Sequence, residues 1–170
     1  MSDTRTARML TRYNAWANKL FFDAVAKLPE GEATKPRTTL FKNIVHTLNH
    51  NYVIDLIFQA HLQGREHGFE ARNTKDHPPL EELARAQAAL DRWYIDWSDG
   101  VTADALNEKV DFKFVGGGPG AMTRAQMLLH IVNHTSYHRG FASDLFYQIP
   151  AKPPTTDLPV FLRDVPQDFD

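Results

Sequence analysis

Three histidines recur at four-residue intervals near the end of the chain, and this spacing constrains the fold more than any other feature. They are His130, His134 and His138. On an α-helix, residues four apart lie one above another on a single face, with neighbouring Cβ atoms roughly 6 Å apart. Two imidazoles placed in this way can bind one metal ion. The spacing therefore predicts a helix that carries a row of metal-binding side chains.

The sequence around this row predicts where the helix begins and ends. Thr123, followed three residues later by Gln126, has the form of a capping box, and Pro150 stops the helix after Ile149. A helical stripe of apolar residues indicates a face that packs against a core rather than against water. Four such residues continue the histidine row: Met127, Ile131, Phe141 and Leu145.

Three further segments ahead of this one show helical periodicity. Apolar residues recur at three- and four-residue steps over residues 4–28, 40–62 and 80–98. A proline or glycine follows each segment within two residues, and these residues end helices. We therefore predict an all-α fold, a four-helix bundle that forms a single domain over residues 1–170.

The segments on either side of the last helix have different patterns. Val110, Phe112 and Phe114 alternate with charged residues, as in a strand. The glycine-rich run 116–120 follows, without the GK[ST] ending of a phosphate-binding loop, so we predict a short β-hairpin-like connector. Residues 151–170 contain several prolines and no helical period, which predicts an extended tail. Its expected anchors are Leu158, Val160, Phe161 and Leu162.

Composition narrows the chemistry available to the chain. It has no cysteine, which excludes thiolate metal sites, disulfides and a cysteine nucleophile, and leaves His, Asp and Glu as metal ligands. The net charge of −2 does not indicate the excess of basic residues that binding to nucleic acid or acidic lipid requires. We see neither a signal peptide nor a run long enough to span a bilayer, so a cytoplasmic protein is expected.

The second predicted helix supplies candidates for a further metal ligand. His50 has mainly apolar neighbours at helical steps, whereas His46 lies among more polar residues, so His50 is the better buried ligand and His46 a rim residue. His61 stands near the end of the helix, where the dipole favours positive charge. His67 and His77 lie in a polar connection and are expected to be solvated.

His50 and the His134–His138 pair could meet at the axis of the bundle. Three imidazoles leave coordination positions free, as in catalytic zinc sites, and suit Zn²⁺ or Ni²⁺ as well as Fe²⁺ or Cu²⁺. HIVNH and HTSYH lack the glutamate of HEXXH zincins, and the Glu-x-x-His spacing of di-iron bundles is absent. The alternative is a helical dimer without metal, whose histidines are satisfied by hydrogen bonds.

Four stretches of the chain resemble a known family. TLNHNYVIDLIFQAHLQG (residues 47–64) and LLHIVNHTSYHRG (128–140) look like the two signature segments of the DinB/YfiT-like, damage-inducible family. YNAWAN (13–18) is similar to its opening helix, and PPTTDLPVFLRD (153–164) to the tail of one subgroup. The resemblance covers nearly the whole chain. It implies an up-down-down-up four-helix bundle that is usually dimeric.

The resemblance also implies a site. The family's metal-binding histidines correspond to His50, His134 and His138, whereas His130 and His46 are not ligand positions. Many members have a glutamine after the Arg-Gly pair, where this chain has Phe141, so a substrate contact assigned to that glutamine does not carry over. The cofactor implied is one divalent ion per chain, Zn or Ni foremost.

Relatives of this fold include thiol-dependent S-transferases and a thiol-dependent maleylpyruvate isomerase, which use low-molecular-weight thiols such as bacillithiol or mycothiol. The first hypothesis is therefore a metal-dependent enzyme acting on a small molecule, either a thiol transferase or a hydrolase that activates water. The second is a metal-binding bundle without catalysis, closed by a fourth ligand such as Asp55 or His130. The third is the metal-free dimer.

Several side chains are candidates for supporting roles in such an enzyme. Arg139 could bind a substrate carboxylate, or form a structural ion pair with an acid on a neighbouring helix. Asn49 and Asn133 each precede a histidine of the set and could orient the site. The candidates for a general base are Tyr13, Asp55, Tyr137 and His46.

Overall fold

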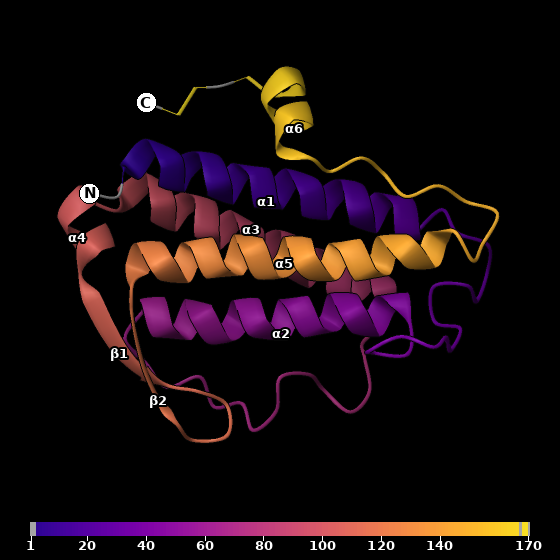
Figure 1. Cartoon of the computed structure of the whole chain (residues 1–170), viewed down its shortest axis with the longest axis horizontal. Helices are drawn as coiled ribbons and strands as arrows, with labels where there is room; N and C mark the ends of the chain where they lie inside the picture. The colour runs from indigo at the N-terminus through magenta and orange to yellow at the C-terminus, as the bar shows by residue number, and fades with distance from the viewer. Residues whose placement is uncertain (1–2, 167, 170) are drawn as a thin grey trace.

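The computed structural model describes residues 3–166, 168 and 169, and most of them are helical. Four long helices lie side by side: α1 (Thr4–Val25), α2 (Ile44–Leu62), α3 (Leu80–Gly100) and α5 (Arg124–Phe146) (Figure 1). Helix α1 packs against α3 and α5, and α2 packs against α5 and α3. In Figure 1, α1 and α5 run from left to right and the other two run in the opposite direction.

The predicted start of α5 is confirmed. The backbone N–H of Gln126 donates to Thr123 Oγ1 at 3.2 Å, and the backbone N–H of Thr123 donates to Gln126 Oε1 at 2.9 Å. This capping box satisfies two backbone donors that the first turn would otherwise leave free. The regular helix ends at Phe146 and continues as turns to Pro150, so the expected end at Ile149 was three residues too far.

Helix α2 begins four residues later than the predicted Leu40. The Asn43 side chain accepts from the backbone N–H of His46 at 2.7 Å and caps the helix there. Just before it, Lys42 has φ of 68°, a left-handed conformation that a helix cannot include. Residues 38–43 therefore form a turn, which leaves Phe41 in a loop beside the first turns of α2.

A two-stranded hairpin connects the short helix α4 (Ala103–Asn107) to α5, as the alternating pattern predicted. Strands β1 (Lys109–Lys113) and β2 (Pro119–Thr123) pair antiparallel, with Phe112 opposite Gly120. A Cβ atom at Gly120 would lie 2.5 Å from the Phe112 ring, which is closer than real side-chain contacts. The glycine therefore allows the aromatic ring to cross the neighbouring strand. The sequence reading did not predict α4.

The tail is not wholly extended, contrary to the prediction for residues 151–170. It contains helix α6 (Leu158–Asp164), with Pro159 in its first turn, where the missing N–H of proline is not needed. Phe161 is fully buried, with its ring 5.8 Å from that of Tyr13 and 5.5 Å from that of Trp16. Of the other expected anchors, Leu162 is 40% exposed.

A buried polar network links the four long helices. Gln87 Nε2 donates to Asp55 Oδ2 and to Asp91 Oδ1, both at 3.0 Å. Asn18 Nδ2 donates to both oxygens of Asp91 at 3.1 Å, and Asn18 Oδ1 accepts from Arg139 at 2.8 Å. All five side chains are almost completely buried. Buried polar groups are costly unless paired, and these pair with one another except for Arg139 Nε, which has no hydrogen-bond partner among the described residues.

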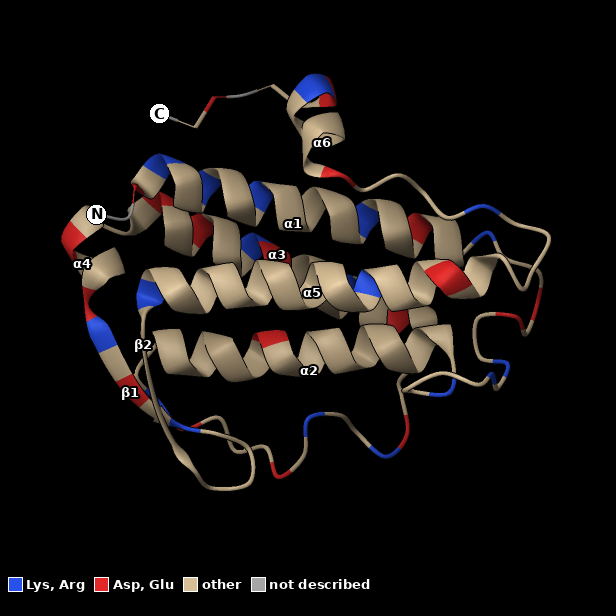
Figure 2. Cartoon of the chain, viewed as in Figure 1, with Lys and Arg blue, Asp and Glu red and all other residues tan. Residues whose placement is uncertain are grey.

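Charged residues are unevenly distributed over the helices (Figure 2). Asp55, in the middle of α2, is the only Lys, Arg, Asp or Glu residue of that helix. Although α2 is otherwise uncharged, none of the described helices combines the length and the hydropathy that a membrane crossing needs.

Candidate metal centre

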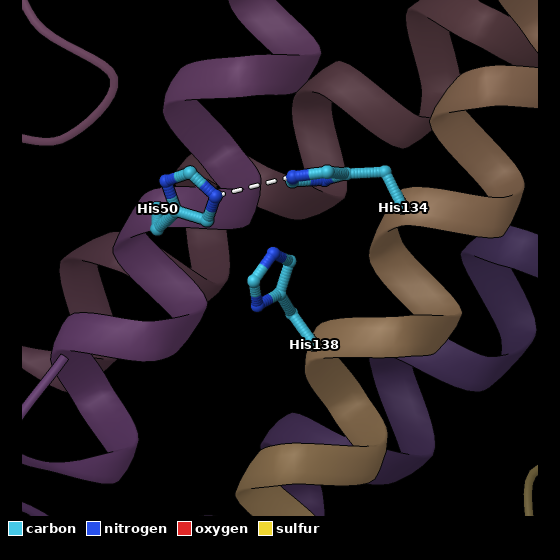
Figure 3. Close-up of side chains that lie close together, drawn as sticks. All are labelled: His50, His134 and His138. Carbon is cyan, nitrogen blue, oxygen red and sulfur yellow. Dashed lines mark hydrogen bonds between the residues drawn. The ribbon is translucent and has the colours of Figure 1, made fainter. Parts of the chain in front are cut away.

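Three histidines from two helices converge between α2 and α5. His50 comes from α2, and His134 and His138 come from successive turns of α5 (Figure 3). One ring nitrogen from each lies within 4.8 Å of the others, and the Nε2 atoms of His50 and His134 are 3.1 Å apart. The structure therefore brings together the three residues expected to form a metal site, and this group could hold a metal ion.

A backbone carbonyl fixes the orientation of His50. Its Nδ1 lies 2.6 Å from the carbonyl oxygen of Arg72, which can only accept a hydrogen bond. The proton of the neutral ring is therefore on Nδ1, and the Nε2 lone pair faces the other two histidines. Asn49 holds the same loop, because its Nδ2 donates to Asn73 Oδ1 and Thr74 Oγ1 at 2.6 Å. The expected orienting role of Asn49 thus has a structural basis, whereas Asn133 is exposed.

Burial keeps the three imidazoles neutral. Loss of solvation lowers the pKa of His50 to about 4, although its hydrogen bond to Arg72 acts in the opposite direction. The pKa of His134 falls to about 3, first through burial and then through the neighbouring histidines. Burial also lowers the pKa of His138. Metal ions bind the neutral form of imidazole, so protons compete little for these ligands at pH 7.

The donor set fits a divalent transition metal. Zinc–nitrogen bonds of about 2.0–2.1 Å in a tetrahedral arrangement place two ligand nitrogens about 3.3 Å apart. The 3.1 Å between His50 Nε2 and His134 Nε2 is close to that spacing. The Nδ1 atoms of His134 and His138 are buried without a hydrogen-bond partner among the described residues. Of the three histidines, only His50 therefore has a hydrogen bond at its Nδ1 that fixes the orientation of the ring.

Aromatic side chains surround the histidines. Phe41 stacks on His50 with ring centroids 4.3 Å apart, and Tyr137 meets the edge of His138 at 5.1 Å. Tyr137 is 61% exposed, Phe141 is 38% exposed, and the centroids of their rings are 4.8 Å apart. Sequence reasoning missed Phe41, because it placed this residue inside a helix. The left-handed conformation of Lys42 could not be predicted from the sequence, whereas the helical period continues through the turn.

The four general-base candidates lie in different environments. The hydroxyl of Tyr13 donates to the Thr156 carbonyl at 2.9 Å, beneath the tail. Asp55 is fully buried in the polar network, and burial raises its pKa well above the usual range. His46 Nε2 lies 2.9 Å from the Thr74 carbonyl oxygen. Of the four, Tyr137 has a ring contact with one of the three histidines.

Arg139, for which the sequence left open a substrate carboxylate or a structural ion pair, faces the interior. Its side chain is 2% exposed, and its guanidinium donates to Asn14 and Asn18 of α1 and to Ser136. A substrate carboxylate could reach it only by displacing these partners. Among the described residues Arg139 forms no direct ion pair with an acid on another helix, the alternative expectation; the Asn18 side chain lies between Arg139 and Asp91 instead.

Neither residue expected to close a structural site joins the histidine group. His130 lies 5.5 Å from His134 between ring centroids, but it packs on Phe58 at 4.5 Å. Asp55 bonds to Gln87, and a weaker contact of 3.4 Å joins it to Thr135. Among the described residues, the group holds only its three histidines.

Two comparisons with known proteins place the chain in a family. Protein DinB of Bacillus subtilis (strain 168) is 25% identical to the chain over 159 residues, which cover 90% of the chain and 91% of that protein. A family model described as the DinB family matches residues 1–168. That match spans nearly the whole sequence, including all three histidines. The chain belongs to the DinB family.

Proposed function

We propose that the chain is a metal-dependent enzyme, with one divalent ion, Zn or Ni, held by His50, His134 and His138. The observation that supports this most strongly is the absence of a fourth protein ligand from the histidine group within the described residues. Structural zinc sites are closed by four protein ligands, whereas catalytic sites keep a position open for water or substrate. The same observation argues against a purely structural ion.

We propose an S-transferase that uses a low-molecular-weight thiol. A divalent ion held by these histidines would lower the pKa of a bound thiol and so supply a thiolate at neutral pH. The thiolate sulfur forms a bond to an electrophilic carbon, the bond from that carbon to its leaving group breaks, and the thiol proton passes to solvent. The exposed rings of Tyr137 and Phe141 beside His138 would hold an apolar electrophile.

Tyr137 is positioned to assist in this reaction. It is the general-base candidate whose ring contacts one of the three histidines, and its side chain is exposed to solvent beside them. We expect Tyr137→Phe to retain the metal and to lower the turnover rate. Because the phenyl ring keeps the edge contact with His138, a change in rate at constant metal content would report on the hydroxyl.

The first test is the metal content of untagged protein, measured by mass spectrometry. We expect about one Zn or Ni per chain in the wild type and its loss in His134→Ala. His130→Ala is the matched control, since it removes a half-buried histidine one turn earlier on the same helix and should keep the ion. A wild type without metal after incubation with Zn²⁺ and Ni²⁺ would refute the proposal.

The second test concerns the reaction. Cysteine and 1-chloro-2,4-dinitrobenzene would be followed for release of chloride and formation of the thioether, with and without a chelator. Activity towards 4-nitrophenyl acetate without thiol would instead indicate the hydrolase. The proposal also includes an up-down-down-up four-helix bundle, a homodimer and a cytoplasmic location, of which the dimer is tested by sedimentation.

A further inference from the structure

A cavity of about 630 Å³ lies at the end of α2, away from the three histidines. Residues of the last turn of α2, the loop that follows it and the β1–β2 hairpin line it. Figure 1 shows where these segments lie in the fold. Its volume is within the range of sites that hold small organic ligands. His61 follows His50 by eleven residues on α2, which separates the cavity from the histidine group by about 16 Å along the helix axis.

His61 is a buried polar side chain that lines this cavity. Its side chain is 4% exposed, and its ring nitrogens form no hydrogen bond with the described residues, but they are not sealed from solvent. Burial lowers its pKa to about 4, so the helix-end dipole does not keep it charged as the sequence suggested. Because these nitrogens reach the solvent of the cavity, a ligand there can form a hydrogen bond with His61 in place of water.

Aromatic rings form the walls around His61. Phe112 packs against it in a tilted arrangement with ring centroids 4.4 Å apart, and the His67 ring is edge-on to it with centroids 5.5 Å apart. Phe69 and Phe114 complete the ring-lined surface. Such walls favour a flat aromatic molecule, since stacked and edge-to-face ring pairs stabilise one another beyond their buried area.

The backbone fixes this arrangement at two points. The α2 helix ends in a Schellman motif, in which Arg65 N–H donates to the Ala60 carbonyl and Gly64 N–H to the His61 carbonyl, both at 3.0 Å. Gly64 has φ of +68°, which turns the following loop back over the cavity. On the opposite side of the cavity, the Phe112 ring lies across the backbone of Gly120 in the neighbouring strand, where a side chain would clash with it.

The charges at the cavity favour a neutral ligand. Arg65 and Lys113 are balanced there by Glu66 and Asp111, all four of them exposed. His67 accepts a hydrogen bond from the Phe69 backbone N–H at its Nδ1. We propose that this cavity binds a planar aromatic molecule with one neutral hydroxyl, a phenol, which donates its hydrogen bond to His61.

The test compares two fluorescent probes, 2-naphthol and 2-methoxynaphthalene, titrated into the full chain. They have the same ring system, but only the first can donate a hydrogen bond. We expect 2-naphthol to bind about tenfold more tightly than its methyl ether, the ratio that one good hydrogen bond gives. In His61→Phe, which keeps an aromatic ring in place, the two probes should bind equally.

Three controls locate the probe. Phe114→Ala should weaken both probes, because that ring is 52% exposed and lines the cavity. Tyr147→Ala removes an exposed ring at the far end of α5 and should change nothing. His134→Ala, with chelator present, should also leave binding unchanged, which separates this site from the proposed metal centre. NMR shifts of the His61 ring on adding 2-naphthol to the wild type provide a readout without any substitution.

Several outcomes would overturn the proposal. These are no saturable binding of 2-naphthol up to millimolar concentration, equal binding of the two probes to the wild type, or loss of binding in His134→Ala. An unshifted His61 resonance in the presence of bound probe would do the same. Failure of the metal proposal would leave this test unaffected, because its readout is probe binding in metal-free protein.

Discussion

Replacing Arg139 with methionine tests the buried polar network directly. Methionine keeps most of the apolar stem and removes the guanidinium. In the wild type this group is 2% exposed and donates to Asn14 Oδ1 at 3.0 Å, Asn18 Oδ1 at 2.8 Å and Ser136 Oγ at 3.0 Å. The substitution leaves these acceptors buried without their donor. It also removes the positive charge nearest to the two buried carboxyl groups.

We expect the variant to lose about 3–5 kcal/mol of unfolding free energy, the range for breaking a buried charged network by removing one partner. Domains of this size are stable by about 5–15 kcal/mol in total, so the loss is large but leaves a folded protein. At about 2–4 °C per kcal/mol, the midpoint of thermal unfolding should fall by roughly 10 °C.

The loss should depend on pH because of Asp91. Burial raises the pKa of this carboxyl to about 6, and Gln87, Asn18 and Arg139 act in the opposite direction. A raised pKa in the folded state stabilises the fold below the unfolded value near 3.8, and this stabilisation is lost as pH rises through about 6. Without Arg139 the ionised carboxylate is less well compensated. The deficit should therefore be larger at pH 8 than at pH 5.

The assay is urea unfolding of metal-free protein at both pH values. Arg12→Met is the matched control, because Arg12 forms a two-point contact with Asp99 at 2.9 Å but on the surface. Exposed pairs contribute about 0–1 kcal/mol, so this control should lose little at either pH. A deficit for Arg139→Met below 1 kcal/mol, or one no larger at pH 8 than at pH 5, would refute the reasoning.

Three further predictions concern separate parts of the chain. Gly120→Ala should destabilise the protein by about 1–3 kcal/mol through the clash with the facing phenyl ring, whereas Gly118→Ala, with open space around it, should be nearly neutral in thermal unfolding. Phe161→Ala should cost about 3–5 kcal/mol in urea unfolding, against well under 1 kcal/mol for the exposed Leu162→Ala, and equal losses would argue against a packed α6. The His61 ring should titrate near pH 4 by NMR, and a titration near pH 6.5 would contradict its burial. Because its pKa is lower in the folded state, His61 should make the unfolding free energy fall as the pH drops from 6.5 to 4, and His61→Phe should remove this part of the pH dependence.

Local signals predicted much of the helical architecture. The capping box at Thr123 lies entirely within four residues of sequence, and both of its hydrogen bonds form. The same kind of signal existed for α6, where Asp157 precedes a helix with Pro159 in its first turn, but the density of prolines suggested an extended tail instead. At α2 the apolar period runs through Leu40, so the cap at Asn43 was overlooked.

Tertiary contacts account for what the sequence could not predict. The four-residue spacing of His134 and His138 is local, but their meeting with His50 depends on the packing of α2 against α5. The polar network was invisible for the same reason. Asp55, Asp91 and Arg139 are residues expected at a surface, and only their mutual contacts explain why all three are buried.

The contact between the tail and α1 has a consequence for how the chain is made. The hydrogen bond from Tyr13 to the Thr156 carbonyl joins residues 143 positions apart, and Phe161 packs on the same helix. During synthesis, this face of the first helix therefore stays uncovered until residues 156–161 have left the ribosome. Contacts of such long sequence separation form late and slowly. A nascent chain stalled shortly before Thr156 would present this aromatic surface to chaperones.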